Sequence, residues 1–462
     1  MSEKIVLFGS SCNPPALHHR RIALELREKG FHVIVVPCGP RPDKLTVDDI
    51  DPIHRAIMTD MTFGGVPGIE VWLGDLEKEA FTRTYELQEL FKSRGEIWHY
   101  VGADLVQGGS RGDSLIQRVW LHGEDLWSNS RFVIGERPGY PLTADELPPR
   151  HVLYPFHYGD SSTRVRERTF KREPIDDLTT PEVARYIERY GLYRGRLPRI
   201  SAKIRIDDPR PLVVFDDRNP KATKLAFSLG VENHPEPNCI VVIGGDGMML
   251  HTIKEYWRRR LPFFGINMGH RGFLLNNVRE GFTLETLREL IVYQHPLLFV
   301  EVFGADGTRR EFFAFNDAWM ERTSPQTAWL TVSVDGDVKF REIKSDGVLI
   351  ATPAGSSAYA HIMGATPMRI GSRGLLLVGN NVIEPWGWKA KPLPADSSVI
   401  IRSLDPDKRP VRACIDNEFV ENAVEMRVRA SRTAAVELTC LPDQDLADKL
   451  EQVLFRKGET HS

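Results

Sequence analysis

Short apolar runs alternate with amphipathic stretches through the first 195 residues, and this alternation limits the possible folds more than any other feature of the sequence. Runs of strand length occur at 4–8, 31–37, 97–102 and 131–135. Between the first two, residues 20–30 carry apolar side chains at helical spacing and end in Gly. A repeated order of strand, loop, helix and strand is typical of a parallel sheet covered by helices. We therefore predict a doubly wound, Rossmann-like α/β domain.

The sequence pattern changes twice after this region. A polar, basic stretch with weak periodicity predicts a linker at 197–210, and the apolar run 211–215 begins a second series of strands and helices. From about 301, short alternating runs favour antiparallel strands. The 462 residues are about three times a typical ~150-residue domain, which agrees with such a division. The predicted parts are an N-terminal domain 1–196, the linker 197–210, an α/β subdomain 211–300, an all-β subdomain 301–440 and a helical tail 441–462.

Charge and cysteine content exclude several classes of protein. The 60 basic and 63 acidic residues nearly cancel, so the chain has no general attraction to nucleic acid or to an anionic membrane. The five cysteines form no Cys-x-x-Cys pair, and no apolar run reaches the ~18 residues of a membrane span. The first ten residues lack a signal-peptide pattern. We predict a cytoplasmic protein with reduced thiols that holds any anion in a local site.

Two segments of the first domain are candidates for phosphate binding. The loop 9–19 follows a predicted strand and precedes a helix, so backbone N–H groups and the side chains of His18 and His19 can face an anion. A polar loop with solvated histidines explains this segment equally well. The segment 159–169 places three hydroxyl groups at a helix start, before Arg166. That arrangement is typical of a phosphate clamp, but also of an ordinary capped helix.

The order of several motifs in residues 4–194 resembles the nicotinamide/nicotinate mononucleotide adenylyltransferases. GSSCNPPALHH at 9–19 is similar to the glycine-rich loop and the T/H-x-G-H motif of that family, and DSSTRVR at 160–166 is similar to its Ile-Ser-Ser-Thr-x-Ile-Arg motif. The other matching segments are PDK at 42–44, HRAIM at 54–58, FTRTYEL at 81–87, VGAD at 101–104, ERPGY at 136–140 and VARYIERYGLY at 183–193.

This resemblance implies a nucleotidyltransferase domain that moves an adenylyl group from ATP to the mononucleotide, with pyrophosphate as the leaving group. It implies that His19 is catalytic and contacts the ATP phosphates. The residues that it implies for binding ATP or phosphate are Gly9, Ser10, His18, His19, Ser161, Ser162, Thr163 and Arg166. Those implied for binding the mononucleotide are Lys44, Thr82 and Asp104.

One part of the loop departs from this family. Ala16 stands where the family has the first His or Thr of T/H-x-G-H, and His18 replaces the Gly. Loss of one preorganised donor at a transition-state charge can cost about 10²–10³ in rate. The sequence therefore leaves two hypotheses, an active adenylyltransferase or a nucleotide-binding regulatory module that has lost catalysis. It also leaves open whether the mononucleotide carries nicotinamide or nicotinate.

The clearest motif of the second half is Gly-Gly-Asp-Gly at 244–247, directly after a predicted strand. Glycines allow the backbone to approach a phosphate closely, and Asp246 lies at the carboxyl end of the strand, where ligands collect in open α/β sheets. The Lys-Ser/Thr ending of a Walker loop is missing. Taken alone, the motif is also typical of a tight turn.

Further segments follow in order and, with the first, resemble the NAD kinases over about 211–440. Met248 and Ala354 depart from the pattern of that family. Diacylglycerol kinases share Gly-Gly-Asp-Gly, but their Pro-x-Gly-Thr-x-Asn-Asp stretch is absent here. The resemblance implies a Rossmann-like subdomain followed by an all-β subdomain. The matching segments are GINMGHRGFL at 265–274, FNDAWMER at 315–322, KSDGVLIATPAGSSAYA at 344–360 and ADSSVIIRS at 395–403.

The second resemblance implies transfer of the γ-phosphoryl group of ATP to the 2′-hydroxyl of the adenosine ribose of NAD. Mg²⁺ or another divalent metal would accompany ATP, and polyphosphate is an alternative donor. Asp246 would be catalytic, by accepting or orienting the hydroxyl proton. We expect a homo-oligomer, since NAD kinases usually form one, and no dedicated metal site. The residues implied for binding NAD are Asp246, Gly247, Asn316, Asp317, Lys344, Asp346, Ser357, Ala358 and Tyr359.

Overall fold

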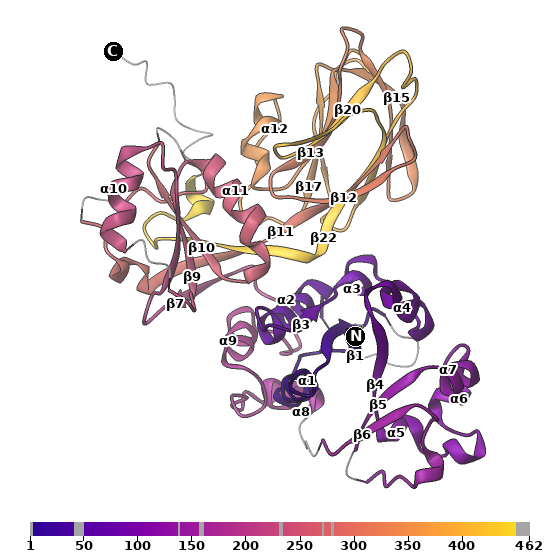
Figure 1. Ribbon diagram of the computed structural model, residues 1–462. Helices are drawn as coiled ribbons and strands as arrows, with labels where there is room; N and C mark the ends of the chain where they lie inside the picture. The colour runs from indigo at the N-terminus through magenta and orange to yellow at the C-terminus, as the bar shows by residue number, and fades with distance from the viewer. Residues whose placement is uncertain are drawn as a thin grey trace, which may run out of the picture. The chain divides into compact units, whose positions relative to one another are not determined.

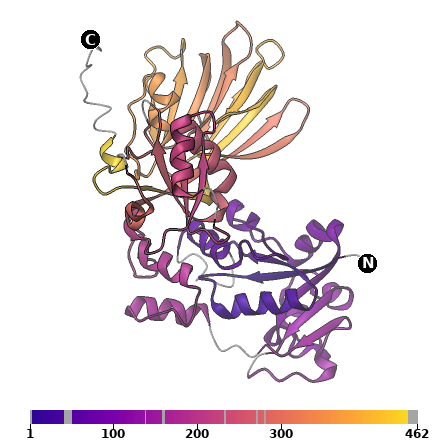
Figure 2. The same ribbon diagram turned by 60° about the vertical axis from the view of Figure 1, so that its left-hand side comes forward.

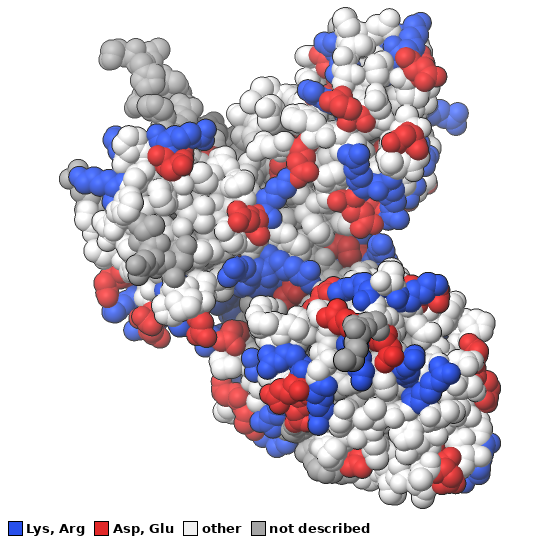
Figure 3. All heavy atoms as spheres, viewed as in Figure 1, with Lys and Arg blue, Asp and Glu red and all other residues white. Residues whose placement is uncertain are grey.

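The chain folds into two compact units, Met1–Pro198 and Arg199–Ser462 (Figure 1). Lys and Arg side chains are interspersed with Asp and Glu on the visible face of each unit (Figure 3), in keeping with the net charge of −3. The computed structural model describes residues 3–40, 50–136, 139–156, 161–230, 234–269, 272–278 and 281–449.

Six parallel strands form the sheet of the first unit, in the order β3-β2-β1-β4-β5-β6. The chain reverses its direction of travel across the sheet between β1 and β4, which is where doubly wound sheets bind ligands. The strands are β1 (Lys4–Ser10), β2 (His32–Pro37), β3 (Ile69–Val71), β4 (Glu96–Gly102), β5 (Arg131–Gly135) and β6 (His151–Tyr154). The helices are α1 (Leu17–Glu28), α2 (Pro52–Phe63), α3 (Gly74–Lys78), α4 (Thr84–Phe91), α5 (Ala103–Val106), α6 (Leu115–Val119), α7 (Gly123–Asn129), α8 (Ser162–Lys171) and α9 (Pro181–Tyr190).

Both faces of this sheet are covered by helices, which explains the continuous apolar runs in its strands. Val6 of β1 belongs to the same buried cluster as Leu26 of α1. The next residue, Leu7, belongs to a second cluster with Phe91 of α4. Figure 2 shows α1 lying along one face of the sheet. Because neighbouring side chains of a strand point to opposite faces, a strand buried on both faces is apolar throughout. The predicted parallel α/β sheet is confirmed.

The second unit contains two sheets: a ten-stranded sheet, in which a parallel part is continued by antiparallel strands, and a six-stranded antiparallel sheet. Strands β8, β9 and β10 are parallel, and the end of β22 extends them by pairing in parallel with β10. The strands are β7 (Ser201–Arg205), β8 (Pro211–Phe215), β9 (Cys239–Gly244), β10 (Pro262–Asn267), β11 (Glu289–Gly304), β12 (Arg309–Ala314), β13 (Asp317–Arg322), β14 (Ala328–Val334), β15 (Asp337–Ser345), β16 (Gly347–Ala351), β17 (Leu375–Asn380), β18 (Lys391–Leu393), β19 (Ser398–Ser403), β20 (Val411–Ile415), β21 (Glu418–Val420) and β22 (Ala423–Cys440). The helices are α10 (Pro220–Leu229), α11 (Asp246–Tyr256) and α12 (Tyr359–Ile362).

Two long strands, β11 and β22, run through both halves of the second unit (Figure 1). They pair antiparallel from Ile291 opposite Cys440 to Gly304 opposite Ala423, with irregularities after Pro296 and after Phe303. The subdomain boundary predicted near 300 therefore lies inside a continuous strand. The alternation of side chains along a strand shows that the strand has a buried face, but it does not show which sheet buries that face.

The predicted linker 197–210 also contains a strand. Residues 201–205 form β7, which pairs antiparallel with Glu289–Tyr293 of β11. Ile204 is the buried residue of β7, and the other four side chains are exposed or half-buried. An edge strand with one buried side chain has too little apolar alternation to be recognised from the sequence, and its partner lies far along the chain.

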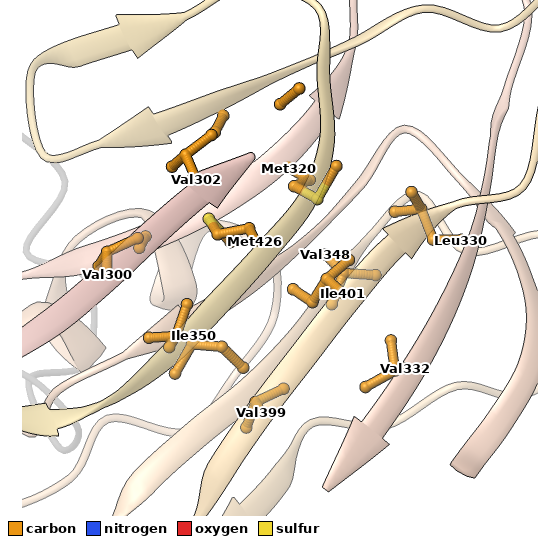
Figure 4. Packing of buried hydrophobic residues seen from close by; sticks show 14 of the residues in the cluster. Val300, Val302, Met320, Leu330, Val332, Val348, Ile350, Val399, Ile401 and Met426 are labelled. Carbon is orange, nitrogen blue, oxygen red and sulfur yellow. The ribbon is translucent and has the colours of Figure 1, made fainter. Parts of the chain in front are cut away.

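The antiparallel part of the larger sheet faces the smaller sheet across one hydrophobic core (Figure 4). Strands β11, β14, β19 and β22 belong to the larger sheet, and β13, β16, β17 and β20 belong to the smaller. Such a face-to-face arrangement is typical of a β-sandwich. Both sheets contribute buried side chains, including Val300, Val302, Leu330, Val332, Val399, Ile401 and Met426 from the larger and Met320, Val348 and Ile350 from the smaller.

The end of the described chain differs from the predicted helical tail 441–462. Of the described residues 441–449, only 446–449 are helical. Residues 450–462 of the predicted tail lie outside the described residues.

All five cysteines are buried, and no disulfide bond joins them. Across the described ranges, no helix combines the length and the apolar character that crossing a membrane requires.

Candidate active sites

The loop after β1 fixes the ring of His19 in the first turn of α1. The backbone N–H of Ala16 donates to His19 Nδ1 at 3.1 Å. Because Nδ1 accepts this hydrogen bond, the proton of the neutral ring belongs on Nε2, which lies 3.0 Å from Ser10 Oγ and donates to it. The rings of His18 and His19 lie against each other, with their centroids 3.8 Å apart. A phosphate oxygen at this point would take the place of Ser10 Oγ as the acceptor of an N–H group that is already oriented.

Ala16 occupies the N-cap position of α1 without a capping side chain. His19, three residues later, makes the capping contact through its Nδ1 atom instead. Ala16 is 1% exposed, so a larger side chain at this position would displace its neighbours. Where the adenylyltransferases have a His or Thr, this chain therefore has a buried methyl group, and His19 serves both as cap and as donor.

The start of α8 lies against the same loop. Ser162 Oγ donates to the Pro14 carbonyl at 2.8 Å, and Arg166 Nη1 donates to the Asn13 carbonyl at 2.6 Å. Arg166 Nη2 also donates to Thr163 Oγ1 at 3.2 Å. The structure thus brings together the two segments that the sequence marks as candidates for phosphate binding, although they are about 150 residues apart in the chain.

Two helices, α1 and α8, begin at this loop. Ser161 Oγ accepts the N–H of Arg164 at 3.2 Å and caps α8. The N–H groups at a helix start and the positive end of the helix dipole favour an anion nearby. Gly9, at the end of β1, has open space where a Cβ would be, so a ligand can approach its backbone closely.

A cavity of about 510 Å³ opens at the carboxyl ends of β1, β2 and β4. It lies where the strand order reverses, the usual ligand position in a doubly wound sheet. Gly9, Ser10 and Thr82 line it, together with the aromatic residues Phe81 and Trp120. A volume of this order suits a small organic ligand. The cavity therefore offers flat apolar surfaces next to Gly9 and Ser10, where the loop after β1 begins.

Asp75 and His99 also line this cavity, and neither was predicted from the sequence. The N–H of Thr82 donates to the Asp75 carboxylate at 3.2 Å, and burial raises the pKa of that carboxyl. Burial lowers the pKa of His99 to about 4, so its ring is neutral at pH 7. The signal for His99 was its position between Ile97 and Val101, on the inward face of a predicted strand.

The other two predicted mononucleotide contacts are placed differently. Asp104 lies in the first turn of α5, directly after β4, and is half-buried. The cavity wall does not include it, as far as the described residues show. Lys44 lies outside the described residues. Of the three, the structure brings Thr82 to the cavity.

A buried arginine holds the loop after β1. Arg55 is 1% exposed, and its Nε and Nη2 donate to the Ser11 carbonyl at 3.0 and 2.5 Å. Nη2 also donates to the Cys38 carbonyl at 2.5 Å. The guanidinium group thus ties the loop after β1 to the segment after β2. The sequence contains Arg55 in a matched segment but gives no sign of this contact.

We expect Arg55→Met to lower the free energy of unfolding of the first unit by about 3 kcal/mol, because two buried carbonyl groups lose charged donors. Chemical denaturation of the full-length protein, followed by tryptophan fluorescence, measures this change. Arg185→Met is the matched control, since Arg185 is exposed on α9. Equal midpoints for Arg55→Met and the control would contradict the anchoring role.

In the second unit, Asp246 is the first residue of α11 and follows β9 after Gly245. Its Oδ2 accepts the N–H of Phe273 at 3.0 Å, and its Oδ1 accepts the N–H of Leu274 at 3.1 Å. Burial raises the pKa of this carboxyl, and the two N–H groups act in the opposite direction. Gly247 is exposed, with open space where a Cβ would be. The backbone therefore fixes this carboxylate at the carboxyl edge of the parallel sheet.

A carboxylate from a distant turn fixes the backbone of Asn316 and Asp317. Asp416, in the turn between β20 and β21, accepts the N–H groups of Phe315, Asn316 and Asp317 at 2.7, 2.9 and 3.2 Å. Asp317 is 2% exposed, and burial together with the neighbouring Asp416 raises its pKa to about 7. Within the described residues, Asp317 Oδ2 has no hydrogen-bond partner.

The segment 352–359 packs onto the same backbone. Thr352 N donates to the Asn316 carbonyl at 2.9 Å, and Thr352 Oγ1 donates to the Phe315 carbonyl at 2.8 Å. Gly355 is required by this packing, because a Cβ there would lie 2.0 Å from the Asn316 carbonyl oxygen. The small residues of the Gly-Ser-Ser-Ala stretch thus allow two backbone segments to touch.

Three predicted NAD contacts, Ser357, Ala358 and Tyr359, follow in the turn that leads into α12. Ser357 Oγ donates to the Ala354 carbonyl at 3.0 Å. The Tyr359 side chain is 54% exposed, and its ring stacks on Trp319 with the centroids 6.0 Å apart. This turn presents an aromatic surface beside the Asn316 segment.

The segments that contain Asp246 and Asn316 pack around one core. Met249 of α11, Phe315 and Ala354 belong to a single buried cluster.

Two predicted NAD contacts, Lys344 and Asp346, lie apart from this group. Asp346 directly precedes β16, and Asp317 pairs with the last residue of that strand, so the two are about 16 Å apart at ~3.3 Å per residue.

Lys344 and Asp346 already have partners in this chain. Asp346 Oδ1 accepts from Arg322 Nε at 2.5 Å, and Asp346 Oδ2 accepts from Asn381 Nδ2 at 2.7 Å. Lys344 Nζ forms an ion pair with Glu384 at 2.8 Å. The structure therefore does not bring Lys344 and Asp346 together with the other predicted NAD contacts.

The second unit belongs to the class of α/β proteins that bind ligands at the carboxyl edge of a parallel sheet, here joined to a β-sandwich. The profile of the ATP-NAD kinase N-terminal domain matches residues 228–292. The NAD kinase of Cereibacter sphaeroides is 36% identical over 222 residues, which are 48% of this chain and 87% of that protein. The NAD kinase of Zymomonas mobilis is 34% identical over 246 residues, 51% of this chain and 94% of that protein. The chain belongs to the NAD kinase family.

A solved structure gives a further similarity. An NAD kinase from Archaeoglobus fulgidus, in complex with ATP, superimposes with a TM-score of 0.42 at 21% identity. The superposition covers 54% of this chain and 100% of that chain.

Proposed function

We propose that the second unit is an NAD kinase, which transfers the γ-phosphoryl group of ATP to the 2′-hydroxyl of the adenosine ribose of NAD and so makes NADP. The observation that carries this proposal is the position of Asp246. In a chain of this family, the carboxylate of the Gly-Gly-Asp-Gly motif is held by two backbone N–H groups at the carboxyl edge of the sheet. A fixed carboxylate at that edge suits a reaction at a hydroxyl group.

In this reaction the ribose 2′-oxygen forms a bond to the γ-phosphorus, the bond from that phosphorus to the bridging oxygen breaks, and ADP leaves. Asp246 accepts the hydroxyl proton, or orients it, as the oxygen attacks. Phosphoryl transfer depends mainly on positioning and on charge stabilisation. The N–H groups of Phe273 and Leu274 keep the Asp246 carboxylate in place while the 2′-oxygen attacks.

We propose that NAD binds along the edge that carries Gly247, Asn316, Asp317 and the 357–359 turn. The exposed ring of Tyr359 supports this position, because it offers a flat apolar surface. Lys344 and Asp346 are part of the proposal as contacts at the far end of β16. The homo-oligomer that we also propose is measured by light scattering.

We expect Gly355→Ala to lower kcat/KM for NAD by about tenfold or more. The new methyl group would meet the Asn316 backbone, and overpacking of this kind typically costs ~1–3 kcal/mol. Steady-state assays of NADP formation measure the effect, and pyrophosphate release by the first unit is the internal control. A kcat/KM for NAD equal to that of the wild type would contradict the proposed position of the dinucleotide.

For the first unit we propose adenylyl transfer from ATP to nicotinamide or nicotinate mononucleotide. An oxygen of the mononucleotide phosphate attacks the α-phosphorus of ATP, the bond to the bridging oxygen breaks, and pyrophosphate leaves. The support is the joint position of the cavity, the oriented His19 Nε2–H and the starts of α1 and α8 at one loop. His19, Ser162, Thr163 and Arg166 would hold phosphate oxygens there.

A second candidate function for the first unit rests on Ala16. Its methyl group is buried at the N-cap of α1, where the adenylyltransferases have a donor side chain. A unit that binds the mononucleotide but lacks this donor would act as a regulatory module of the kinase. Pyrophosphate release distinguishes the two functions, because binding alone produces none.

Mg²⁺ is proposed to arrive with ATP. In the described part of the chain, no group of three or more His, Cys, Asp or Glu side chains could hold a metal ion. Mg²⁺ in kinase sites is held largely by water and substrate phosphates, so the residues present fit an ion that is bound to the nucleotide. The ion would neutralise charge on the phosphate groups. ATP is the proposed donor, and inorganic polyphosphate in place of ATP tests the alternative.

Incubation of the purified full-length protein with ATP, Mg²⁺ and NAD tests the kinase. We expect NADP in the chromatogram, and its absence would contradict the proposal. A second incubation contains ATP, Mg²⁺ and either mononucleotide. Dinucleotide and pyrophosphate in equal amounts would support adenylyl transfer, whereas mononucleotide binding without pyrophosphate would support the regulatory function.

A further inference from the structure

The residues after β22, 441–449, lie on the loop 273–277 and are here named the C-terminal brace. Asn277 N donates to Gln444 Oε1, and Gln444 Nε2 donates to the Asn277 carbonyl, both at 2.7 Å. Leu441 N donates to Asn276 Oδ1 at 3.0 Å. Three hydrogen bonds therefore fix the C-terminal brace on this loop.

The same loop holds the carboxylate of Asp246. The N–H groups of Phe273 and Leu274 donate to Asp246, and the carbonyl of the next residue, Leu275, accepts from Lys449 Nζ. Consecutive residues of one loop thus bind the Asp246 carboxylate and the Lys449 ammonium group. The Lys449 side chain is half-buried and interacts electrostatically with Asp246. The loop 273–275 therefore links a cation of the C-terminal brace to the carboxylate of the Gly-Gly-Asp-Gly motif.

We propose that Lys449 is a positioning residue of the kinase reaction, whose ammonium group keeps Asp246 ionised and oriented toward the hydroxyl group of the substrate. This inference rests on the proposed NAD kinase function. A buried carboxylate loses hydration, and a nearby opposite charge replaces part of what it loses. Lys449 acts through Asp246, and its attachment to Leu275 keeps it from folding away into solvent.

The charges around the pair agree with this role. Burial raises the pKa of Asp246, and Lys449 acts in the opposite direction together with the two N–H groups. Burial lowers the pKa of Lys449, and Cys440 and Asp246 oppose that change. The other titratable groups of this region are Tyr293 of β11, Asp445 and Asp448 of the C-terminal brace, and Arg369, which faces Asp448. Asp445 is hydrogen-bonded to Tyr293 at 2.6 Å, and Asp448 lies 3.5 Å from Arg369.

The test is the pH dependence of kcat/KM for NAD in the full-length protein. Loss of the cation makes ionisation of Asp246 harder and raises its pKa, so the acid limb of the profile moves to higher pH. For Lys449→Gln we expect a shift of about one pH unit, the lower end of the effect of a nearby opposite charge. Lys449→Arg keeps the charge and should return the acid limb of the pH profile to its wild-type position. Lys224→Met, an exposed lysine of α10, is the matched control.

A purely structural role for Lys449 would lower activity at every pH and leave the limb in place. That result, or an acid limb of Lys449→Gln that coincides with the wild type, would overturn the inference. Thermal unfolding checks that the variant is folded, and Lys449→Met replaces Lys449→Gln if it is not. A wild-type protein that makes no NADP would contradict the proposed function itself, so the two failures are distinguishable.

Discussion

Asp246→Asn is expected to lower NADP formation from NAD by about 10³-fold, within the range for loss of a general base. The amide has nearly the same shape as the carboxylate, but it cannot accept a proton. It also has one acceptor oxygen where the structure requires two, because the N–H groups of Phe273 and Leu274 bind separate oxygens of Asp246. Coupled assay of NADP formation at saturating ATP and NAD measures the loss in kcat.

Two controls make this result specific to the kinase. Asp217→Asn changes an exposed carboxylate near the same edge of the sheet and should leave NADP formation unchanged. Pyrophosphate release with a mononucleotide, the proposed activity of the first unit, should also persist in Asp246→Asn. A variant that retains wild-type kinase activity would refute the role of Asp246.

His19→Ala is expected to lower pyrophosphate release from ATP and mononucleotide by about 10²–10³-fold. The reason is that the substitution removes the Nε2–H donor, which the Ala16 and Ser10 contacts orient at the start of α1. Because Ala16 offers no donor of its own, the first unit has little to compensate the loss. Steady-state release of pyrophosphate is the measurement, with NADP formation from added NAD as the internal reference.

His151→Ala is the matched control for this substitution, since His151 is exposed at the start of β6. Thermal unfolding separates a loss of chemistry from a loss of the helix cap, which typically costs ~1 kcal/mol. Pyrophosphate release that is equal in His19→Ala and the wild type would contradict the assignment of His19. Release that is absent from both would favour the regulatory function.

The parts of the fold that the sequence predicts well are those with a strong local pattern. The runs at 4–8 and 131–135 became β1 and β5, because a strand buried on both faces is apolar throughout. Strand β7 was missed because only Ile204 is buried in it. The predicted subdomain boundary near 300 falls inside β11, because β11 and β22 continue through the second unit within one sheet and their side-chain pattern does not change there.

The residues of the candidate sites also differ in how well the sequence predicts them. Asp246 could be predicted because its motif is short and follows a strand, so the motif itself sets its position. The contacts that fix a site often come from distant residues, and no local pattern reveals them. Asp416 accepts N–H groups from residues 315–317, about 100 positions earlier, and Arg55 reaches Ser11, 44 positions earlier. Such contacts appear only when the chain is folded.

We propose that one chain carries both activities, and a single incubation tests this proposal. The full-length protein receives ATP, Mg²⁺ and nicotinamide mononucleotide, without added NAD, and the products are separated by chromatography over time. We expect NAD to appear first and NADP to follow, and the Asp246→Asn variant to stop at NAD. A parallel incubation with nicotinate mononucleotide reports the alternative dinucleotide. If neither mononucleotide yields a dinucleotide, while the same protein converts added NAD to NADP, the claim of two activities is contradicted.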